Sequence, residues 1–191
     1  MAEQGDRRGQ GARLARTPRR ITPDYLQRAA MHYLERYSAP AAQLRRVLAR
    51  KIALSCRHHG EDPALHEPAL NDVVARCVSS GLADDRRFAE ARAATLRRRG
   101  RSARAVAASL AAKGVSRELA EGASSVGDEE ELAAARKAAR RKRLGPWTRG
   151  DRTASRQKDL AAMARAGFTV TVARAVIDGT GDDEANGGIL A

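Results

Sequence analysis

Side chains able to bind a metal are concentrated in one stretch of this sequence. Two cysteines and three histidines fall within it: Cys56, His58, His59, His66 and Cys77. A structural zinc site needs four ligands, usually in pairs with characteristic spacings. Cys56 and His58 are too close in the chain for the usual pair, and Cys77 lies on the apolar face of a predicted helix. We therefore expect buried cysteines, solvated histidines and no metal.

Acidic residues form a pair, Asp84-Asp85, and a run over residues 128–131. Adjacent residues on a helix point to different faces, so neither group has the geometry of a catalytic pair or a cation cage. Carboxylates do bind free backbone N–H groups at helix starts, and we expect both groups to begin helices. The sequence contains no phosphate-binding glycine loop and no nucleophile-elbow motif. It therefore predicts no enzyme activity and no cofactor.

Arginine-rich segments are the strongest candidates for a binding function. The chain has 36 basic and 23 acidic residues and a net charge of +13, which favours polyanionic partners. Residues 86–104 and 136–158 hold most of this excess; a solvated basic face is the alternative for either run. Aromatic residues are few, so readout of base sequence is not expected. The candidate contact residues are Arg97, Arg98, Arg99, Arg101, Arg104, Arg140, Arg141, Lys142 and Arg143.

Apolar residues recur with the period of a helix in several segments, beginning at Leu26, shortly after Thr22, which can cap a helix start. Large apolar side chains are scarce, which suits closely packed helices with several modest cores. No apolar run reaches the length of a membrane-spanning helix, and the N-terminus has no apolar signal segment. We expect an all-α, soluble, cytoplasmic protein.

An internal repeat organises these helices. Residues 109–123 and 162–176 align without gaps at an offset of 53, each as a helix, a glycine turn and a second helix. An earlier segment aligns less cleanly at an offset of 62. Chance similarity between alanine-rich helices is the alternative. The pattern predicts three tandem three-helix, helix-turn-helix-like repeats stacked into an elongated, curved body.

Composition and turn residues predict where these parts begin and end. The N-terminal residues are basic and lack apolar period, and the last residues are polar and glycine-rich. The expected parts are a disordered basic arm at 1–21, repeats at 22–82, 83–126 and 127–178, and a flexible tail at 179–191. The first repeat contains a long predicted loop at 55–68, and a second predicted loop at 145–155 precedes the last helices, which are expected from about Arg156.

Residues 81–115 resemble the central block of the RecX family, bacterial regulators of the RecA recombinase. Residues 33–51 and 165–177 are similar to the family's opening and closing blocks. The first repeat departs from the family pattern in the spacing from Ser38 to Leu44 and in its long loop. We interpret the matching residues as caps, turn glycines and core anchors: Gly81, Leu82, Asp84, Asp85, Phe88, Gly100, Leu110, Gly114, Gly167 and Phe168.

The resemblance implies a non-enzymatic regulator, mainly an inhibitor, of RecA's recombinase and coprotease activities in DNA recombination, repair and the SOS response. It implies a monomer that lies along the groove of the RecA–DNA filament through a basic face. DNA would be contacted weakly or through the filament, with no membrane partner. The residues themselves leave open an alternative, a general nucleic-acid-binding helical module.

Overall fold

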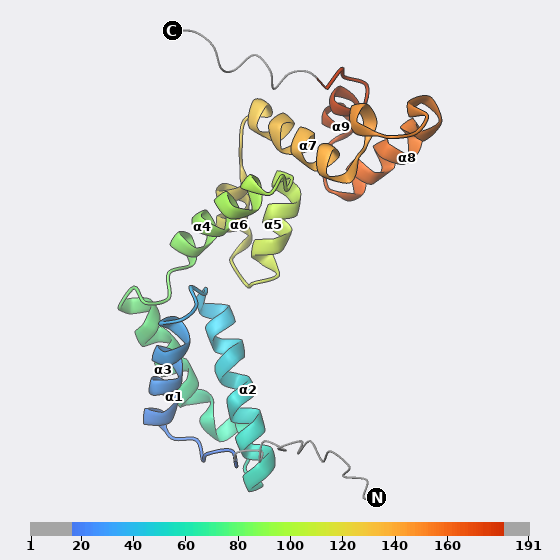
Figure 1. Ribbon diagram of the computed structural model, residues 1–191. Helices are drawn as coiled ribbons and strands as arrows, with labels where there is room; N and C mark the ends of the chain where they lie inside the picture. Colours follow the sequence, from blue (N-terminus) through green and yellow to red (C-terminus); the bar gives the residue numbers. More distant parts are fainter. Residues whose placement is uncertain (1–16, 182–191) are drawn as a thin grey trace, which may run out of the picture.

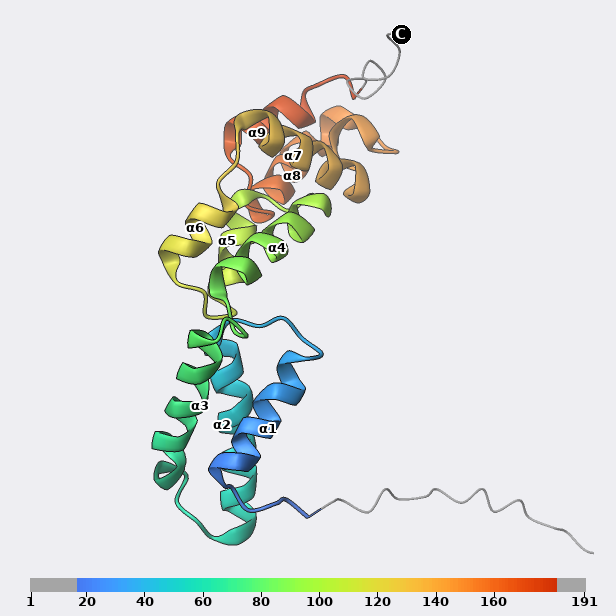
Figure 2. The same ribbon diagram turned by 90° about the vertical axis from the view of Figure 1, so that its left-hand side faces the viewer.

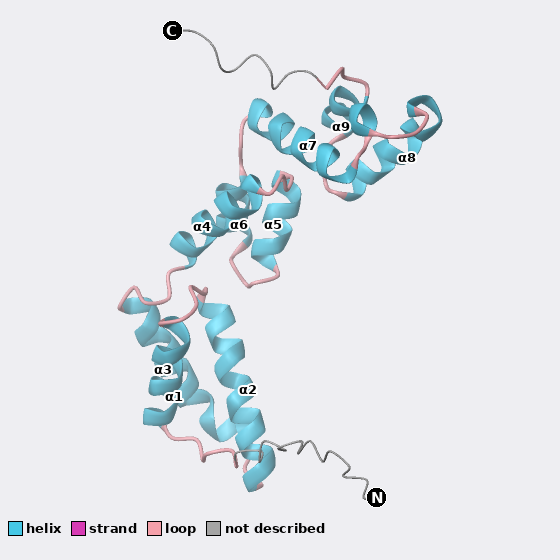
Figure 3. Ribbon diagram, in the orientation of Figure 1, coloured by secondary structure: helices cyan, strands magenta, loops and turns pink. Residues whose placement is uncertain are grey.

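The computed structural model describes residues 17–181, so most of the expected arm and tail, 1–16 and 182–191, lies outside the described residues. Within 17–181 the secondary structure is helical throughout, without a strand (Figure 3). The all-α prediction is confirmed. The helices are α1 Pro23–Leu34, α2 Ala41–His59, α3 Glu67–Ser79, α4 Asp85–Arg98, α5 Ala103–Ala111, α6 Arg117–Ser124, α7 Asp128–Lys142, α8 Arg152–Arg165 and α9 Val170–Ile177, with 3-10 turns η1 Pro63–His66 and η2 Gly145–Trp147.

The helices pack in three groups of three, and each group has its own buried core. We call them unit 1 (α1–α3), unit 2 (α4–α6) and unit 3 (α7–α9). The units follow one another along an elongated body, with the first and last at opposite ends in both views (Figures 1 and 2). No helix in the described range is long and apolar enough to cross a membrane.

Helix starts follow the predicted caps. Thr22 accepts a hydrogen bond from the Tyr25 backbone N–H at 3.1 Å, as an N-cap hydroxyl should. Asp84 caps α4, accepting from the Arg87 N–H at 2.9 Å. These local contacts fix where helices begin, independently of what the helices later pack against.

Two helices are longer than the sequence predicts. α2 continues through residues 55–59, which were expected to be loop, and ends at Gly60 with φ +69°. α8 begins at Arg152 rather than near Arg156, because the Asp151 carboxylate accepts from two backbone N–H groups at the helix start. In both cases the polar residues that suggested a loop lie in an exposed turn at the end of a helix.

The arm also ends earlier than predicted, because residues 17–21 pack against α2. Ser55 donates a hydrogen bond to the Arg19 carbonyl at 2.8 Å, and His59 Nε2 lies 2.9 Å from the Pro18 carbonyl. Ile21 is buried in the core of unit 1. The expectation of disorder up to residue 21 is therefore wrong for this short segment.

The aligned turns of units 2 and 3 have the same backbone geometry. Gly114 and Gly167, 53 residues apart, have φ values of +91° and +92°, a region that favours glycine. The residue after each turn donates back to the preceding helix at 3.2 Å, Val115 to the Leu110 carbonyl and Phe168 to that of Met163. The repeat seen in the sequence is thus a repeat of one turn conformation.

The same carboxylate contact joins each unit to the next. In the first joint, Asp85 of unit 2 accepts from the free N–H of Ala41 at the start of α2, at 2.8 Å. In the second, Glu131 of unit 3 accepts from the N–H of Ala103 at the start of α5, at 3.1 and 3.2 Å. Each acid satisfies a helix N-terminus in the preceding unit.

The glycine turns complete both joints. A Cβ on Gly114 would lie 2.5 Å from the Ala42 Cβ, and a Cβ on Gly167 would lie 2.6 Å from the Ser102 hydroxyl oxygen. Ala42 and Ser102 belong to the starts of α2 and α5. Each turn therefore needs its glycine for two reasons: the positive φ and the close approach to the neighbouring helix start.

Candidate polyanion-binding groove

An open groove of about 780 Å³ lies where α5, α7 and α8 meet, between units 2 and 3. Five exposed basic side chains line it, and no carboxylate does among the described residues. Five like charges facing one space attract an anion strongly, because its binding relieves their mutual repulsion. The basic residues are Arg101, Arg104, Arg141, Lys142 and Arg165.

Small residues and the second joint hold these side chains in place. Ala105, Ala108 and Ala138 line the groove without filling it. The Ser102 hydroxyl donates to the Ala166 carbonyl at 2.8 Å, so the end of α8 is fixed against the start of α5. A Cβ on Gly100 would lie 3.0 Å from the Ala134 carbonyl oxygen, so the turn before α5 also contacts α7.

Arg97 has a different environment from the groove residues. Its guanidinium pairs with Glu131 at 2.5 Å, and the two side chains are only 14% and 15% exposed. Glu131 is the acid that caps α5, so Arg97 supports the second joint. We therefore set Arg97 apart from the candidate contact surface.

The remaining candidates are exposed but lie outside the groove lining. Arg98 donates to the Thr95 hydroxyl at 3.2 Å, and the Arg99 carbonyl accepts a hydrogen bond from Arg141. Arg143 ends α7 in the left-handed conformation, with φ +57°, where glycine would be less strained. Arg140 is exposed on α7. Of the nine predicted residues, the structure brings Arg101, Arg104, Arg141 and Lys142 together.

Sequence reasoning missed Arg165, the fifth cation of the groove. It is isolated from the basic runs, so charge density gave no signal for it. The repeat could nevertheless have drawn attention to Arg165, because this residue lies two positions before Gly167, the turn glycine that the repeat identified. Only the packing of that turn against α5 brings Arg165 and Arg104 into the lining of one groove.

The residues that carry the family resemblance have mostly structural positions. Gly81 and Gly100 end helices with φ +70° and +71°, and Leu110 is fully buried. Phe88 packs partly buried against the core of unit 2, and Phe168 is buried in unit 3. Leu82 is different: it is 43% exposed, and it does not anchor a core.

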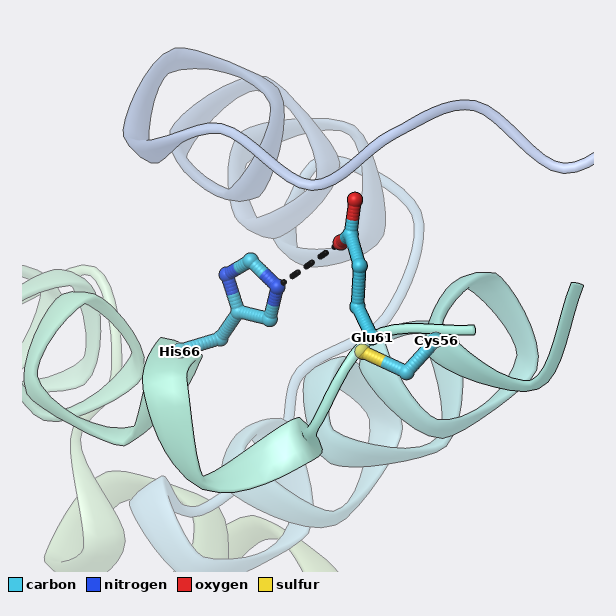
Figure 4. Close-up of side chains that lie close together, drawn as sticks. All are labelled: Cys56, Glu61 and His66. Carbon is cyan, nitrogen blue, oxygen red and sulfur yellow. Dashed lines mark hydrogen bonds and ion pairs between the residues drawn. The ribbon is translucent and has the colours of Figure 1, made fainter. Parts of the chain in front are cut away.

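Three potential metal ligands do meet in unit 1 (Figure 4). The ligand atoms of Cys56, Glu61 and His66 lie within 4.8 Å of one another. Sequence reasoning considered Cys56 and His66 but not Glu61, and it did not bring the three together. His58, His59 and Cys77 do not belong to this cluster.

The Glu61 carboxylate already has two partners. One Glu61 oxygen pairs with Arg20 and the other lies 3.3 Å from His66 Nε2. Burial, together with the nearby carboxylates of Glu61 and Asp62, raises the pKa of the Cys56 thiol, which disfavours the thiolate that binds metals. The Arg20–Glu61 ion pair thus links the segment before α1 to the residues that follow α2.

Comparisons with known proteins agree on one family. Residues 84–123 match the family model for the second three-helix domain of RecX. The regulatory protein RecX of Myxococcus xanthus is 42% identical over 168 residues, covering 84% of this chain and 88% of that protein. The crystal structure of RecX from Lactobacillus salivarius has a TM-score of 0.65 at 16% identity, covering 83% of this chain and 96% of the other. The latter similarity concerns the fold.

Proposed function

Because the chain belongs to the RecX family of regulatory proteins, we propose that it regulates the RecA recombinase, mainly as an inhibitor, by lying along the groove of the RecA–DNA filament. The family expected from residues 81–115 is confirmed by the 42% identity to a RecX protein over 168 residues, and the family model for its second domain matches residues 84–123. Members of the family are regulators rather than enzymes, as the sequence predicted for this chain.

The observation that carries the proposed binding mode is the basic groove between units 2 and 3. Its five cations suit acidic protein surface and nearby phosphate equally, and a filament offers both. The elongated stack of three units suits a partner made of several subunits in a row, such as a RecA filament (Figure 1). An extended body in the filament groove would exclude a second DNA strand or a repressor sterically.

We propose that the protein acts as a monomer in the cytoplasm. The five cations of the groove come from three helices and one turn of a single chain, so binding through this groove does not require a second copy. Light scattering during size-exclusion chromatography tests this directly. A dimer mass at working concentration would contradict it.

The regulatory role is tested by adding the protein to RecA on single-stranded DNA. We expect ATP hydrolysis and strand exchange to fall as the protein approaches the filament's subunit concentration. Unchanged rates at near-stoichiometric levels would refute the proposal. Tight, sequence-dependent DNA binding without RecA at about 150 mM salt would instead favour a general nucleic-acid-binding module, because salt weakens the phosphate contribution.

The groove is tested by the double charge reversal Arg104→Glu with Lys142→Glu. Both side chains are exposed, so the variant should fold, and we expect about tenfold weaker binding to RecA filaments or more, since each reversal removes an attraction and adds a repulsion. The control is Arg50→Glu with Arg76→Glu, exposed positions on α2 and α3 with the same change in net charge. Equal losses in both variants would mean that net charge, and not the groove, determines binding.

A further inference from the structure

Two tyrosines, one partly buried and one exposed, form an aromatic pair near the boundary between units 1 and 2. The ring centroids of Tyr33 and Tyr37 are 5.2 Å apart, with the planes tilted by 39°. Tyr33 packs partly against the core of unit 1, but Tyr37 is 57% exposed. Core packing therefore accounts for Tyr33 and leaves Tyr37 unexplained.

A basic groove of about 480 Å³ lies on the unit 1 side of this pair. Both tyrosines line it, and Arg28, Arg36 and Lys51 contribute cations from α1, the turn after it and α2. Residues of α1 three, four, seven and eight apart share one face, which is why aromatic and basic side chains line the same space. No carboxylate of the described residues lines this groove.

A smaller pocket of about 210 Å³ lies on the other side of the pair, against unit 2. The same two tyrosines line it together with Phe88, Arg92 and Lys113. The buried Nε of Arg92 has no hydrogen-bond partner among the described residues. A buried N–H without an acceptor is costly, so the present position of the Arg92 side chain is not fully satisfied, and a shift of this side chain toward an anion in the pocket would relieve that cost.

We propose that this tyrosine pair is a stacking site for single-stranded DNA, with bases on the aromatic rings and phosphates on the flanking cations. Aromatic rings between basic grooves are the arrangement by which proteins bind single strands without sequence preference. Duplex DNA keeps its bases paired and cannot offer their faces. An acidic peptide would use the cations but would gain little from an exposed ring.

This site lies in unit 1 and its boundary with unit 2, separate from the groove between units 2 and 3. It acts on DNA directly and does not require the proposed binding to RecA. A failure of one proposal therefore leaves the other standing.

The experiment compares two oligonucleotides, an oligothymidine of about 15 nucleotides and an abasic strand of the same length, by fluorescence anisotropy without RecA. Removing the ring in Tyr37→Leu should weaken oligothymidine binding about fivefold or more, because stacking of one base contributes roughly 1–3 kcal/mol. Binding of the abasic strand should not change. Tyr37→Phe keeps the ring and should bind as the wild type does.

The cations make a second, different prediction. Arg36→Gln should weaken both strands alike and reduce the salt dependence of binding by about one phosphate contact. Base stacking would be refuted if Tyr37→Leu bound oligothymidine as tightly as the wild type does. It would also be refuted if Tyr37→Leu lost affinity equally for oligothymidine and for the abasic strand. A loss in Tyr37→Leu that appears with polyglutamate but not with oligothymidine would overturn it too, in favour of an acidic protein partner. Thermal unfolding monitored by circular dichroism verifies that each variant is folded.

Discussion

Replacing Gly114 by alanine tests the joint between units 1 and 2. At φ +91° an added Cβ costs about 1–2 kcal/mol in backbone strain alone. The Cβ would also lie 2.5 Å from that of Ala42, far inside normal contact, and overpacking of this kind costs about 1–3 kcal/mol. We expect Gly114→Ala to lower the free energy of unfolding by about 2–5 kcal/mol, measured by urea denaturation followed by circular dichroism.

Gly81→Ala separates the two contributions. Gly81 also has a positive φ, +70°, but a Cβ there would meet nothing within 4 Å. It should lose only the strain, about 1–2 kcal/mol. Small-angle scattering should show a changed stack of units for Gly114→Ala and an unchanged one for Gly81→Ala.

A double-mutant cycle with Ala42→Gly measures the contact itself. Without the Ala42 Cβ, a Cβ on Gly114 would lie 3.7 Å from the Ala42 Cα, an ordinary contact distance. The Arg46 Nη2 atom, at 2.8 Å, is then the one neighbour closer than this, and as the end of a flexible side chain it can move away at little cost. Ala42→Gly alone should cost about 0.5–1 kcal/mol because glycine weakens a helix. The double variant should be more stable than the sum of single effects predicts, by about 1–3 kcal/mol. Additivity within about 0.5 kcal/mol would refute the close approach as the reason for glycine.

Three further variants test other parts of the structure. Glu131→Gln should destabilise the protein by about 2 kcal/mol or more in urea, because it leaves the Arg97 guanidinium mostly buried without its charge partner. Co²⁺ at neutral pH should give no thiolate charge-transfer absorption, because the cluster offers three ligand groups, its Glu61 carboxylate is already paired with Arg20 and His66, and the raised pKa of Cys56 further disfavours the thiolate. The Arg156 guanidinium holds the pKa of Asp178 below its ordinary value of 3.8, so this carboxylate stabilises the fold above that pH and the contribution disappears as pH falls through the lowered pKa. Asp178→Asn should therefore flatten the dependence of stability on pH below about 4.

Each of these has a matched control or a contradicting result. Glu130→Gln changes an exposed acid on the same helix and should alter stability by less than about 0.5 kcal/mol. A cobalt band that disappears in Cys56→Ser would establish a metal site. An unaltered acid-unfolding profile in Asp178→Asn would mean that its ion pair with Arg156 contributes nothing to folding.

Local chemistry made much of the fold predictable. The caps Thr22 and Asp84 act on residues three positions away, and the turn glycine at 114 is needed for its own φ. A cap residue or a turn glycine therefore determines the structure of residues only a few positions away in the sequence. The helical period also identified buried faces, such as that of Leu110, because burial within a unit depends on neighbours a few turns away.

Contacts between units were not predictable in the same way. Arg97 pairs with Glu131, 34 residues away, and nothing in a basic run distinguishes it from exposed Arg98. Arg165 lines the groove only because unit 3 packs against unit 2. Helical period says which face of a helix is buried in its own unit, but it does not give the angle between units. The packing of residues 17–21 depends likewise on the unexpected length of α2.

The two joints share one construction, an acid on a helix N-terminus and a glycine turn against the same helix start. A body made by repeating one joint is a short segment of a screw, with a rotation and a rise set by that joint. Its surface therefore advances around an axis as it extends, and equivalent side chains of successive units follow a spiral. Any change at a joint glycine alters the pitch for everything beyond it, so a single methyl group at position 114 would reorient two whole units relative to the first.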